Sequence, residues 1–209
     1  MEPLINKIIS ASIELFRQYG FKTITMDDIA RHTALSKKTL YQHFANKHEV
    51  VNDSVIWYKE QMSDTIDTLI KDTENALDAM VRMLAFMDDM NRRINPMALY
   101  ELKKYFPEAY NKFRELLVEK DVVMLRNNIT QGMQEGLYRQ KLNADLLARY
   151  RLETSLLILQ PHLLLNEESY NGSILIEIGE HFLYGIMTQK GVELYHKYKV
   201  KYLNQATTI

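Results

Sequence analysis

The chain has 209 residues, of which 46% are hydrophobic and 25% are charged, which is enough for a small helical head and one larger domain. It contains no cysteine, so disulfides, thiolate metal sites and cysteine nucleophiles are excluded. There is no signal peptide and no apolar run of about 18 residues that could span a membrane, so we expect a cytoplasmic protein without membrane contact.

Charge is distributed unevenly along the chain. The net charge is −1, yet the first fifty residues hold seven Lys or Arg against five Asp or Glu. Basic charge is therefore mildly concentrated at the N-terminal end. Weak, strongly salt-dependent affinity for any duplex DNA is the expected consequence, because the electrostatic part of binding follows the number of phosphates neutralised.

The first predicted helix covers residues 3 to 20. Ile5, Ile9, Ile13 and Phe16 follow helical spacing and make one apolar face. Gly20 stands where a glycine C-cap commonly ends a helix. This helix can support the segment that follows it.

Residues 25–47 predict two short helices joined by a tight turn. Thr25 is a good N-cap, and Asp28 three residues later can complete a capping box, so a helix should begin at Met26. Ser36 can cap a second helix that begins at Lys37. About three residues separate the two helices, which is typical of a helix-turn-helix.

The second of these helices has a basic and aromatic outer face. Leu40 and Phe44 are four apart and should face inward. The side chains left outside are those of Lys37, Lys38, Thr39, Tyr41, Gln42 and His43. Lysines, hydroxyls and a helix N-terminus suit phosphates and guanine edges, so we expect a DNA reader. Two alternatives are an ordinary amphipathic pair with a solvated basic face, and a module that docks an acidic protein; salt-sensitive duplex binding separates the latter from a DNA reader.

The segment FRQYGFKTITMDDIARHTALSKKTLYQHFANKHEVV resembles the N-terminal DNA-binding segment of the TetR family of bacterial regulators, over about 45 residues. The matching elements are the helix ending in Tyr-Gly, the Thr-x-x-x-Ile-Ala opening, the Ser-Lys-x-Thr-Leu-Tyr-x-His-Phe helix and the Asn-Lys that follows. Together they are highly specific.

The resemblance implies roles for individual side chains. Lys37 and Lys38 are expected to face bases, and His43 to lie near the DNA backbone. Phosphate contacts are expected from Thr25, Thr39, Tyr41 and Lys47, and Ser36 completes the predicted DNA-binding set. The chain departs from the family at Lys38, where a small residue is frequent, and at Ala34, where glycine is common. A left-handed alanine costs on the order of 1 to 2 kcal/mol, so the turn either carries strain or takes another geometry.

The rest of the chain predicts further helices. They are expected at 47–70, as a linker helix, and at 75–90, 96–105, 107–135, 144–160 and from Ser173 onward, with a last short helix after Gly191. Gly136 should act as a C-cap and Pro161 should end or kink its helix. Four methionines of the second of these helices, Met80, Met83, Met87 and Met90, share one stripe, which fits ordinary core or the lining of a ligand pocket.

The resemblance also implies a ligand pocket and a dimer. The pocket candidates rest on family topology and are Trp57, Met62, Met83, Met87, Tyr100, Phe113, Met124, Tyr150 and Glu153. Arg151 and Glu153 stand in an otherwise apolar helix, so we expect an interhelical ion pair or a contact that orients a polar ligand group.

Two helices near the C-terminus are apolar on more than one face, which indicates two partners for each. One partner is this chain and the other a second copy, through a four-helix interface of the kind by which TetR-like proteins dimerise. The expected interface residues are Leu156, Ile174, Ile178, Phe182 and Ile186. The alternative is the centre of a monomeric bundle.

The sequence therefore predicts an all-α protein of about nine to ten helices. Residues 1–47 form a helix-turn-helix DNA-binding domain, and residues 48–209 a ligand-binding and dimerisation domain. We expect a homodimeric transcriptional regulator, most simply a repressor, released from a double-stranded operator by a small-molecule effector. The chain has no nucleophile elbow, phosphate loop or metal-binding histidine spacing, so neither catalysis, a metal nor a cofactor is expected.

Overall fold

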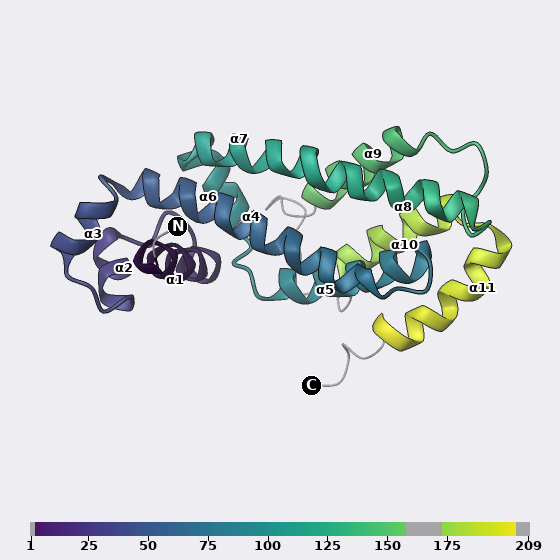
Figure 1. The fold of residues 1–209 in the computed structure, drawn as a ribbon, viewed down its shortest axis with the longest axis horizontal. Helices are drawn as coiled ribbons and strands as arrows, with labels where there is room; N and C mark the ends of the chain where they lie inside the picture. Colours follow the sequence, from purple (N-terminus) through teal and green to yellow (C-terminus); the bar gives the residue numbers. More distant parts are fainter. Residues whose placement is uncertain (1–2, 158–172, 204–209) are drawn as a thin grey trace. The chain divides into compact units, whose positions relative to one another are not determined.

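The computed structural model describes residues 3–157 and 173–203, and these are almost entirely helical (Figure 1). The helices in chain order are α1 Pro3–Tyr19, α2 Met26–His32, α3 Lys37–His43, α4 Lys47–Lys71, α5 Ala76–Arg92, α6 Ala98–Tyr105, α7 Pro107–Leu116, η1 Leu117–Asp121, α8 Val122–Gln134, α9 Ala144–Leu157, α10 Ile174–Ile186, α11 Gln189–Tyr198 and η4 Lys199–Leu203. The all-α prediction is confirmed.

The helices fall into two compact units. The N-terminal unit contains residues 3–62 and 93–117, and the C-terminal unit contains the described parts of 63–92, 118–158 and 162–209. The N-terminal unit is larger than the predicted DNA-binding domain of residues 1–47, because α6 and α7 pack with it. A functional boundary at residue 47 stays a prediction.

The helix-turn-helix is fixed by local hydrogen bonds. Thr25 caps α2 through the predicted capping box, in which its hydroxyl oxygen accepts from the N–H of Asp28 at 3.2 Å while Asp28 accepts from the N–H of Thr25 at 3.0 Å. Ser36 caps α3 and accepts from the N–H of Thr39 at 3.0 Å. Both predicted helix starts are confirmed.

The turn between α2 and α3 is a Schellman motif with an alanine in the left-handed position. The N–H of Leu35 donates to the carbonyl of Ala30 at 2.9 Å, and the N–H of Ala34 donates to Arg31 at 3.2 Å. Ala34 has φ +56°. The turn therefore keeps the geometry that glycine favours, and the alanine carries the strain.

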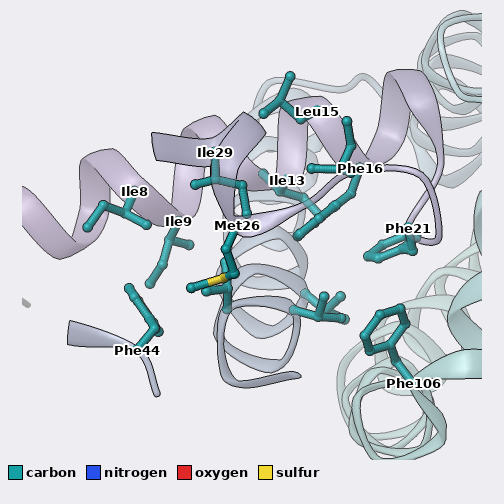
Figure 2. Packing of buried hydrophobic residues seen from close by; sticks show 14 of the residues in the cluster. Ile8, Ile9, Ile13, Leu15, Phe16, Phe21, Met26, Ile29, Phe44 and Phe106 are labelled. Atoms are coloured by element: carbon teal, nitrogen blue, oxygen red, sulfur yellow. The ribbon is translucent and has the colours of Figure 1, made fainter. Parts of the chain in front are cut away.

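The core of the N-terminal unit is aromatic and aliphatic (Figure 2). Phe16 stacks on Phe21 with ring centroids 5.0 Å apart, and Phe21 meets Phe106 of the α6–α7 corner at 6.2 Å. Leu40 and Phe44 are buried in the same cluster, as predicted. Burial of these side chains holds α3 against α1 and α2, at roughly 1.5 to 3 kcal/mol for each large side chain.

Gly20 ends α1 with φ +90°, and its N–H donates to the carbonyl of Phe16. A Cβ at this position would lie 2.6 Å from the carboxylate of Glu101, which accepts from the N–H of Lys22 at 2.9 Å. Glycine is required here by both the backbone and the close approach of Glu101 from α6.

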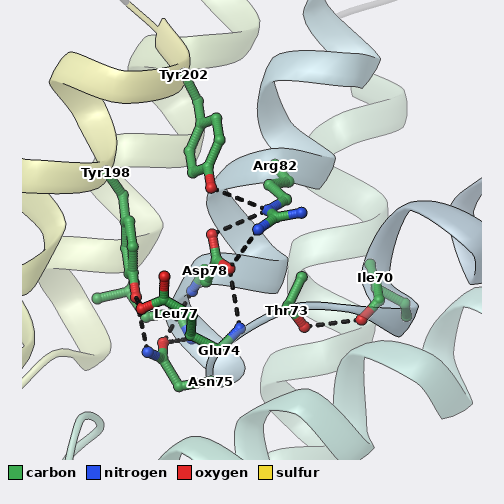
Figure 3. A network of polar contacts seen from close by, with 9 residues as sticks. All are labelled: Ile70, Thr73, Glu74, Asn75, Leu77, Asp78, Arg82, Tyr198 and Tyr202. Carbon is green, nitrogen blue, oxygen red and sulfur yellow. Dashed lines mark hydrogen bonds and ion pairs between the residues drawn. The ribbon is translucent and has the colours of Figure 1, made fainter.

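A polar network joins α5 to α11 and η4 in the C-terminal unit (Figure 3). Asp78 is fully buried, pairs with Arg82 at 2.9 Å and caps α5 by accepting from the N–H of Glu74 at 3.0 Å. Arg82 also donates to the hydroxyl of Tyr202 at 3.1 Å, and Asn75 donates to Tyr198 at 2.8 Å. The tail of the chain is thus attached to the start of α5 by side-chain hydrogen bonds.

Two predicted elements differ in detail. The helix expected over 107–135 is divided into α7, a π-helical turn at Leu117–Asp121, and α8, with Gly136 following at φ +69° as the expected C-terminal glycine. The helix expected from Pro96 begins at Ala98, because Asn95 accepts from the N–H of Met97 before the helix starts. Pro161 lies outside the described residues.

Candidate nucleic-acid interface and effector cavity

Helix α3 presents an exposed polar face. Lys37, Lys38, Tyr41 and Gln42 are exposed, whereas Leu40 is completely buried and fixes the rotation of the helix. Tyr41 is 51% exposed although it is large and aromatic. The side chains that are free to meet a ligand are therefore cations, a hydroxyl and an amide, the groups that contact phosphates and base edges.

Lys37 is held by an acid of the neighbouring helix. Its ammonium lies 2.5 Å from the carboxylate of Asp27 at the start of α2, and both side chains are about half exposed or more. An exposed pair of this kind is worth only about 0 to 1 kcal/mol. Lys38, by contrast, is exposed without such a pair in the described structure.

The predicted hydroxyl contacts have structural duties as well. The Thr25 hydroxyl donates to Asp28 at 2.6 Å, and the hydroxyls of Ser36 and Thr39 share a hydrogen bond of 2.8 Å. Hydrogen bonds from the Thr25 side chain and then from its N–H lower the pKa of Asp28, so this carboxylate stays ionised as a cap. Thr25 and Ser36 are exposed, and Thr39 is half-buried.

Lys47 and His43 are less open than predicted. Lys47 is half-buried, donates to the carbonyl of Lys22 at 3.2 Å and lies over the ring of Phe106 at 5.4 Å. Burial lowers its pKa, against the smaller raising effects of Glu101 and Asp28. His43 is half-buried at the end of α3. A phosphate contact by Lys47 requires its ammonium to leave the Lys22 carbonyl.

The C-terminal unit contains a cavity of about 550 Å³ between the end of α4, the start of α5 and the η1–α8 turn. Its apolar lining comes from Ile66, Ile70, Ala79, Met83, Val123 and Met124. Its polar lining comes from Ser63, Asp67, Thr73, Glu119, Lys120, Asp121, Asn127, Asn128 and Gln131. The size and the mixture of apolar walls and polar groups are those of small-molecule sites.

The predicted pocket residues are only partly brought together. Met83 and Met124 line the cavity. Met87, Tyr150 and Glu153 belong to the same unit but do not line it, and Tyr150 is 51% exposed. Four other candidates, Trp57, Met62, Tyr100 and Phe113, belong to the N-terminal unit.

The predicted dimer residues are largely used within one chain. Leu156, Phe182 and Ile186 are 8%, 5% and 2% exposed, and Ile174 and Ile178 are half-buried. The exposed stripe of α9 instead carries Leu146, Arg149, Tyr150 and Glu153, and that of α10 carries Glu177, His181, Tyr184 and Gly185. A second copy that packs on these helices would meet those side chains first.

Arg151 is buried on α9 with no acid of the described residues paired to it. The ion pair offered as one reading of the sequence is therefore not formed by Arg151. Glu153 lies two residues further on, at an exposed position of the same helix.

Sequence reasoning missed Asp27 as a partner of Lys37 and the polar half of the cavity. Asp27 was counted only as favourable to the α2 dipole, although the first turns of two helices joined by a short turn often lie close together. Asn127, Asn128 and Gln131 form a polar stripe on α8. That stripe was the available signal for the cavity.

Comparison with known proteins identifies the N-terminal segment. Residues 8–53 match the family described as "Bacterial regulatory proteins, tetR family". The chain is 26% identical over 182 residues to the uncharacterized HTH-type transcriptional regulator YvaF of Bacillus subtilis, which covers 86% of this chain and 94% of YvaF. It is 32% identical over 109 residues to IcaR of Staphylococcus epidermidis, the negative regulator of the biofilm operon icaADBC, with 51% and 56% covered.

The fold is shared with solved regulators. The crystal structure of the transcriptional regulator FadR from Bacillus subtilis in complex with stearoyl-CoA has a TM-score of 0.64 and 18% identity, over 86% of this chain and 95% of that one. Together with the capped helix-turn-helix and its exposed basic helix, these matches show that the chain is a transcriptional regulator and belongs to the TetR family.

Proposed function

We propose that the protein represses transcription by binding a near-palindromic double-stranded operator as a homodimer, and that a small-molecule effector releases it. The observation that carries the proposal is the exposed face of α3, where Lys37, Lys38, Tyr41 and Gln42 stand free while Leu40 is buried. Lys37 and Lys38 would read bases, and Tyr41 and Thr39 would hold phosphates. The proposal assigns no catalytic activity and places the protein in the cytoplasm.

Two copies are needed because α3 has only seven residues and can reach only a few base pairs. Two heads placed about one helical turn of DNA apart read a two-fold symmetric site, and the symmetry adds affinity and specificity. The exposed stripes of α9 and α10 support this part of the proposal, since they leave Leu146, Tyr150 and Tyr184 for a partner.

Effector control is supported by the cavity in the C-terminal unit. An effector acts if it binds one conformation of the dimer more tightly than the other, and about 1 to 3 kcal/mol of coupling is typical. FadR, which shares the fold, was crystallised with stearoyl-CoA. Repression, as opposed to activation, is supported by IcaR, which is a negative regulator.

The test is selection of bound duplexes from a random DNA pool by the purified protein, followed by a salt titration of the winning sequence. The proposal predicts an enriched near-palindrome whose binding constant falls steeply with salt. No enrichment, with only weak salt-sensitive binding, would contradict operator recognition and favour a module that docks an acidic protein.

A further inference from the structure

Arg151 is a buried cation on α9. It is 7% exposed and lies on the buried stripe of the helix with Ala148 and Leu152, which are 0% and 6% exposed. Arg149 of the same helix makes the opposite choice: its side chain is 55% exposed and pairs with Asp145 at 3.0 Å. The two arginines therefore have different environments on one helix, although only one residue separates them.

The contacts of Arg151 do not neutralise its charge. Its Nη1 donates to the hydroxyl of Ser155 at 2.6 Å, and its guanidinium lies over the ring of Phe182 of α10 at 5.9 Å. No carboxylate in the described part of the chain pairs with it. The buried acids Asp78 and Asp88, in contrast, each pair with an arginine one turn further on, Arg82 and Arg92.

Arg151 nevertheless stays charged at neutral pH. Burial lowers its pKa to about 10, which leaves the guanidinium protonated near pH 7. A buried charge without a counter-charge is costly, and natural structures pair such groups. A guanidinium has five N–H donors, and a single hydroxyl uses one of them.

The remaining donors are reachable. Among the described residues, the buried side-chain atoms that are closed off from solvent and lack a partner are Asn6 Oδ1, Ser12 Oγ and Arg17 Nε. The nitrogens of Arg151 are not among these atoms. They therefore border a space in which an oxygen atom of a small molecule can be placed.

We propose that Arg151 receives the acidic group of the effector, a carboxylate or a phosphate attached to an apolar body. A guanidinium binds either group through two parallel charge-assisted hydrogen bonds. Ala148, Leu152 and Phe182 offer apolar surface beside it. This inference rests on the proposed effector control and names the chemical class of the ligand.

The 550 Å³ cavity is a poorer place for an acidic group. Arg151 does not line it, and its charged lining comprises Asp67, Glu119 and Asp121 against Lys120. The acidic end of an effector is repelled by such a lining. The only other source of a counter-charge is a carboxylate from a second copy of the chain, and the experiment separates this case.

The experiment measures binding of three probes with the same chain length: octanoate, octyl phosphate and octanol. Each is titrated calorimetrically into the wild type, Arg151→Met and Arg149→Met. The matched control removes an exposed, paired arginine of the same helix. We expect octanoate or octyl phosphate to bind the wild type and Arg149→Met, and to lose binding to Arg151→Met. Which of the two acids binds more tightly identifies the carboxylate or phosphate source.

The ligand-free stability gives a second readout. Methionine fills the site without a charge, so the melting temperature of Arg151→Met should be unchanged or rise, by up to about 2 to 4 °C. Arg151→Lys keeps the charge but loses the two-pronged geometry, and we expect roughly tenfold weaker binding of the acid. If Arg151→Met does not fold, the lysine variant decides.

The proposal is overturned if no acidic probe binds, if octanol binds as well as the acids, or if Arg151→Met retains acid binding. It is also overturned if Arg151→Met dissociates a dimer in sedimentation, because the counter-charge then comes from the second copy. None of these readouts uses DNA. Failure of operator binding would therefore be seen separately, in the duplex selection.

Discussion

Lys37 and Asp27 form the contact in which a single residue has most influence on DNA recognition. Their ion pair of 2.5 Å holds the ammonium of Lys37 on the protein and places a negative charge beside the DNA-facing helix. Any phosphate that approaches Lys37 must compete with Asp27. The pair is therefore expected to weaken binding to unspecific DNA more than binding to the operator, where a base edge compensates for the lost carboxylate.

Asp27→Asn should strengthen binding to a scrambled duplex about threefold, within the value of an exposed ion pair, and so lower the ratio of specific to unspecific affinity. Fluorescence anisotropy at constant salt measures both constants. Glu14→Gln is the control, because it removes an exposed acid from α1 without touching α3. If Asp27→Asn has the same effect in a Lys37→Met background, Asp27 does not act through Lys37.

Lys37→Ala should relax base preference by about 1 to 3 kcal/mol at one position of each half-site, whereas Tyr41→Phe should weaken all sequences alike. The measurement is a panel of operator duplexes with single substitutions. Retention of the full preference by Lys37→Ala would refute its base-reading role.

Ala34 stores strain in the turn between α2 and α3. Its φ of +56° lies in the left-handed region, and the surrounding Schellman hydrogen bonds keep it there. Ala34→Gly should stabilise the protein by roughly 1 kcal/mol, less the greater freedom of glycine in the unfolded chain. Urea denaturation measures the change. Ala30→Gly, at a buried position inside helical α2, should destabilise instead.

Helix boundaries were predictable where a side chain caps the backbone. Thr25, Ser36 and Ser173 each accept from an N–H of the helix that follows, and all three starts follow from residue type and spacing. The π-helical turn at Leu117–Asp121 was not predictable, because it is a change of hydrogen-bond register inside a helical sequence. Amphipathic spacing does not record such a change.

Site chemistry was predictable to a smaller extent. The outer face of α3 follows from the inward spacing of Leu40 and Phe44, and the exposed positions of Lys37 and Tyr41 agree with it. The ion pair of Asp27, the burial of Lys47 and the isolation of Arg151 depend on which side chains tertiary packing brings together. Spacing along one helix carries no information about partners on another.

Asp78 fixes the start of α5 to the end of the chain. It is buried, pairs with Arg82 and accepts from the N–H of Glu74. Asp78→Asn should destabilise the protein by roughly 2 to 4 kcal/mol, because it leaves Arg82 without its counter-charge. Lys112→Gln, which removes one partner of an exposed pair with Glu115, should change stability by less than about 1 kcal/mol and is the control.

The same carboxylate makes stability depend on pH. Burial raises the pKa of Asp78, but hydrogen bonds from Arg82, Glu74 and Tyr202 outweigh it and bring the pKa below 3.8. A lowered pKa in the folded state stabilises the protein above pH 3.8, and this contribution is lost as pH falls through the folded value. The difference in melting temperature between wild type and Asp78→Asn should therefore shrink below pH 3.8. A constant difference would show that ionisation of Asp78 is not the cause.

For the whole molecule, the dimer determines whether two α3 helices can act together. The exposed large side chains of α9 and α10 are Leu146, Tyr150 and Tyr184. Glutamate at both Tyr150 and Tyr184 should convert the dimer to a monomer in sedimentation, because charges buried at an interface must be desolvated. Tyr19→Glu, at another exposed tyrosine, is the control. An unchanged sedimentation coefficient would place the dimer contact elsewhere.

The effector and the operator are linked through these two compact units, and no described helix is long and apolar enough to cross a membrane. If an acidic effector binds Arg151 and lowers operator affinity, linkage requires the operator to lower effector affinity by the same factor. Both constants can be measured on one preparation.

The central claim is sequence-specific binding by two copies of α3, and the most direct measurement compares three duplexes in sedimentation and anisotropy: the selected near-palindrome, the same duplex with one half-site scrambled, and a fully scrambled duplex. We predict two chains on the palindrome, affinity about 10³-fold or more above the scrambled duplex, and loss of most of that gain when one half-site is removed. One chain per duplex, or equal affinity for all three, would contradict the account.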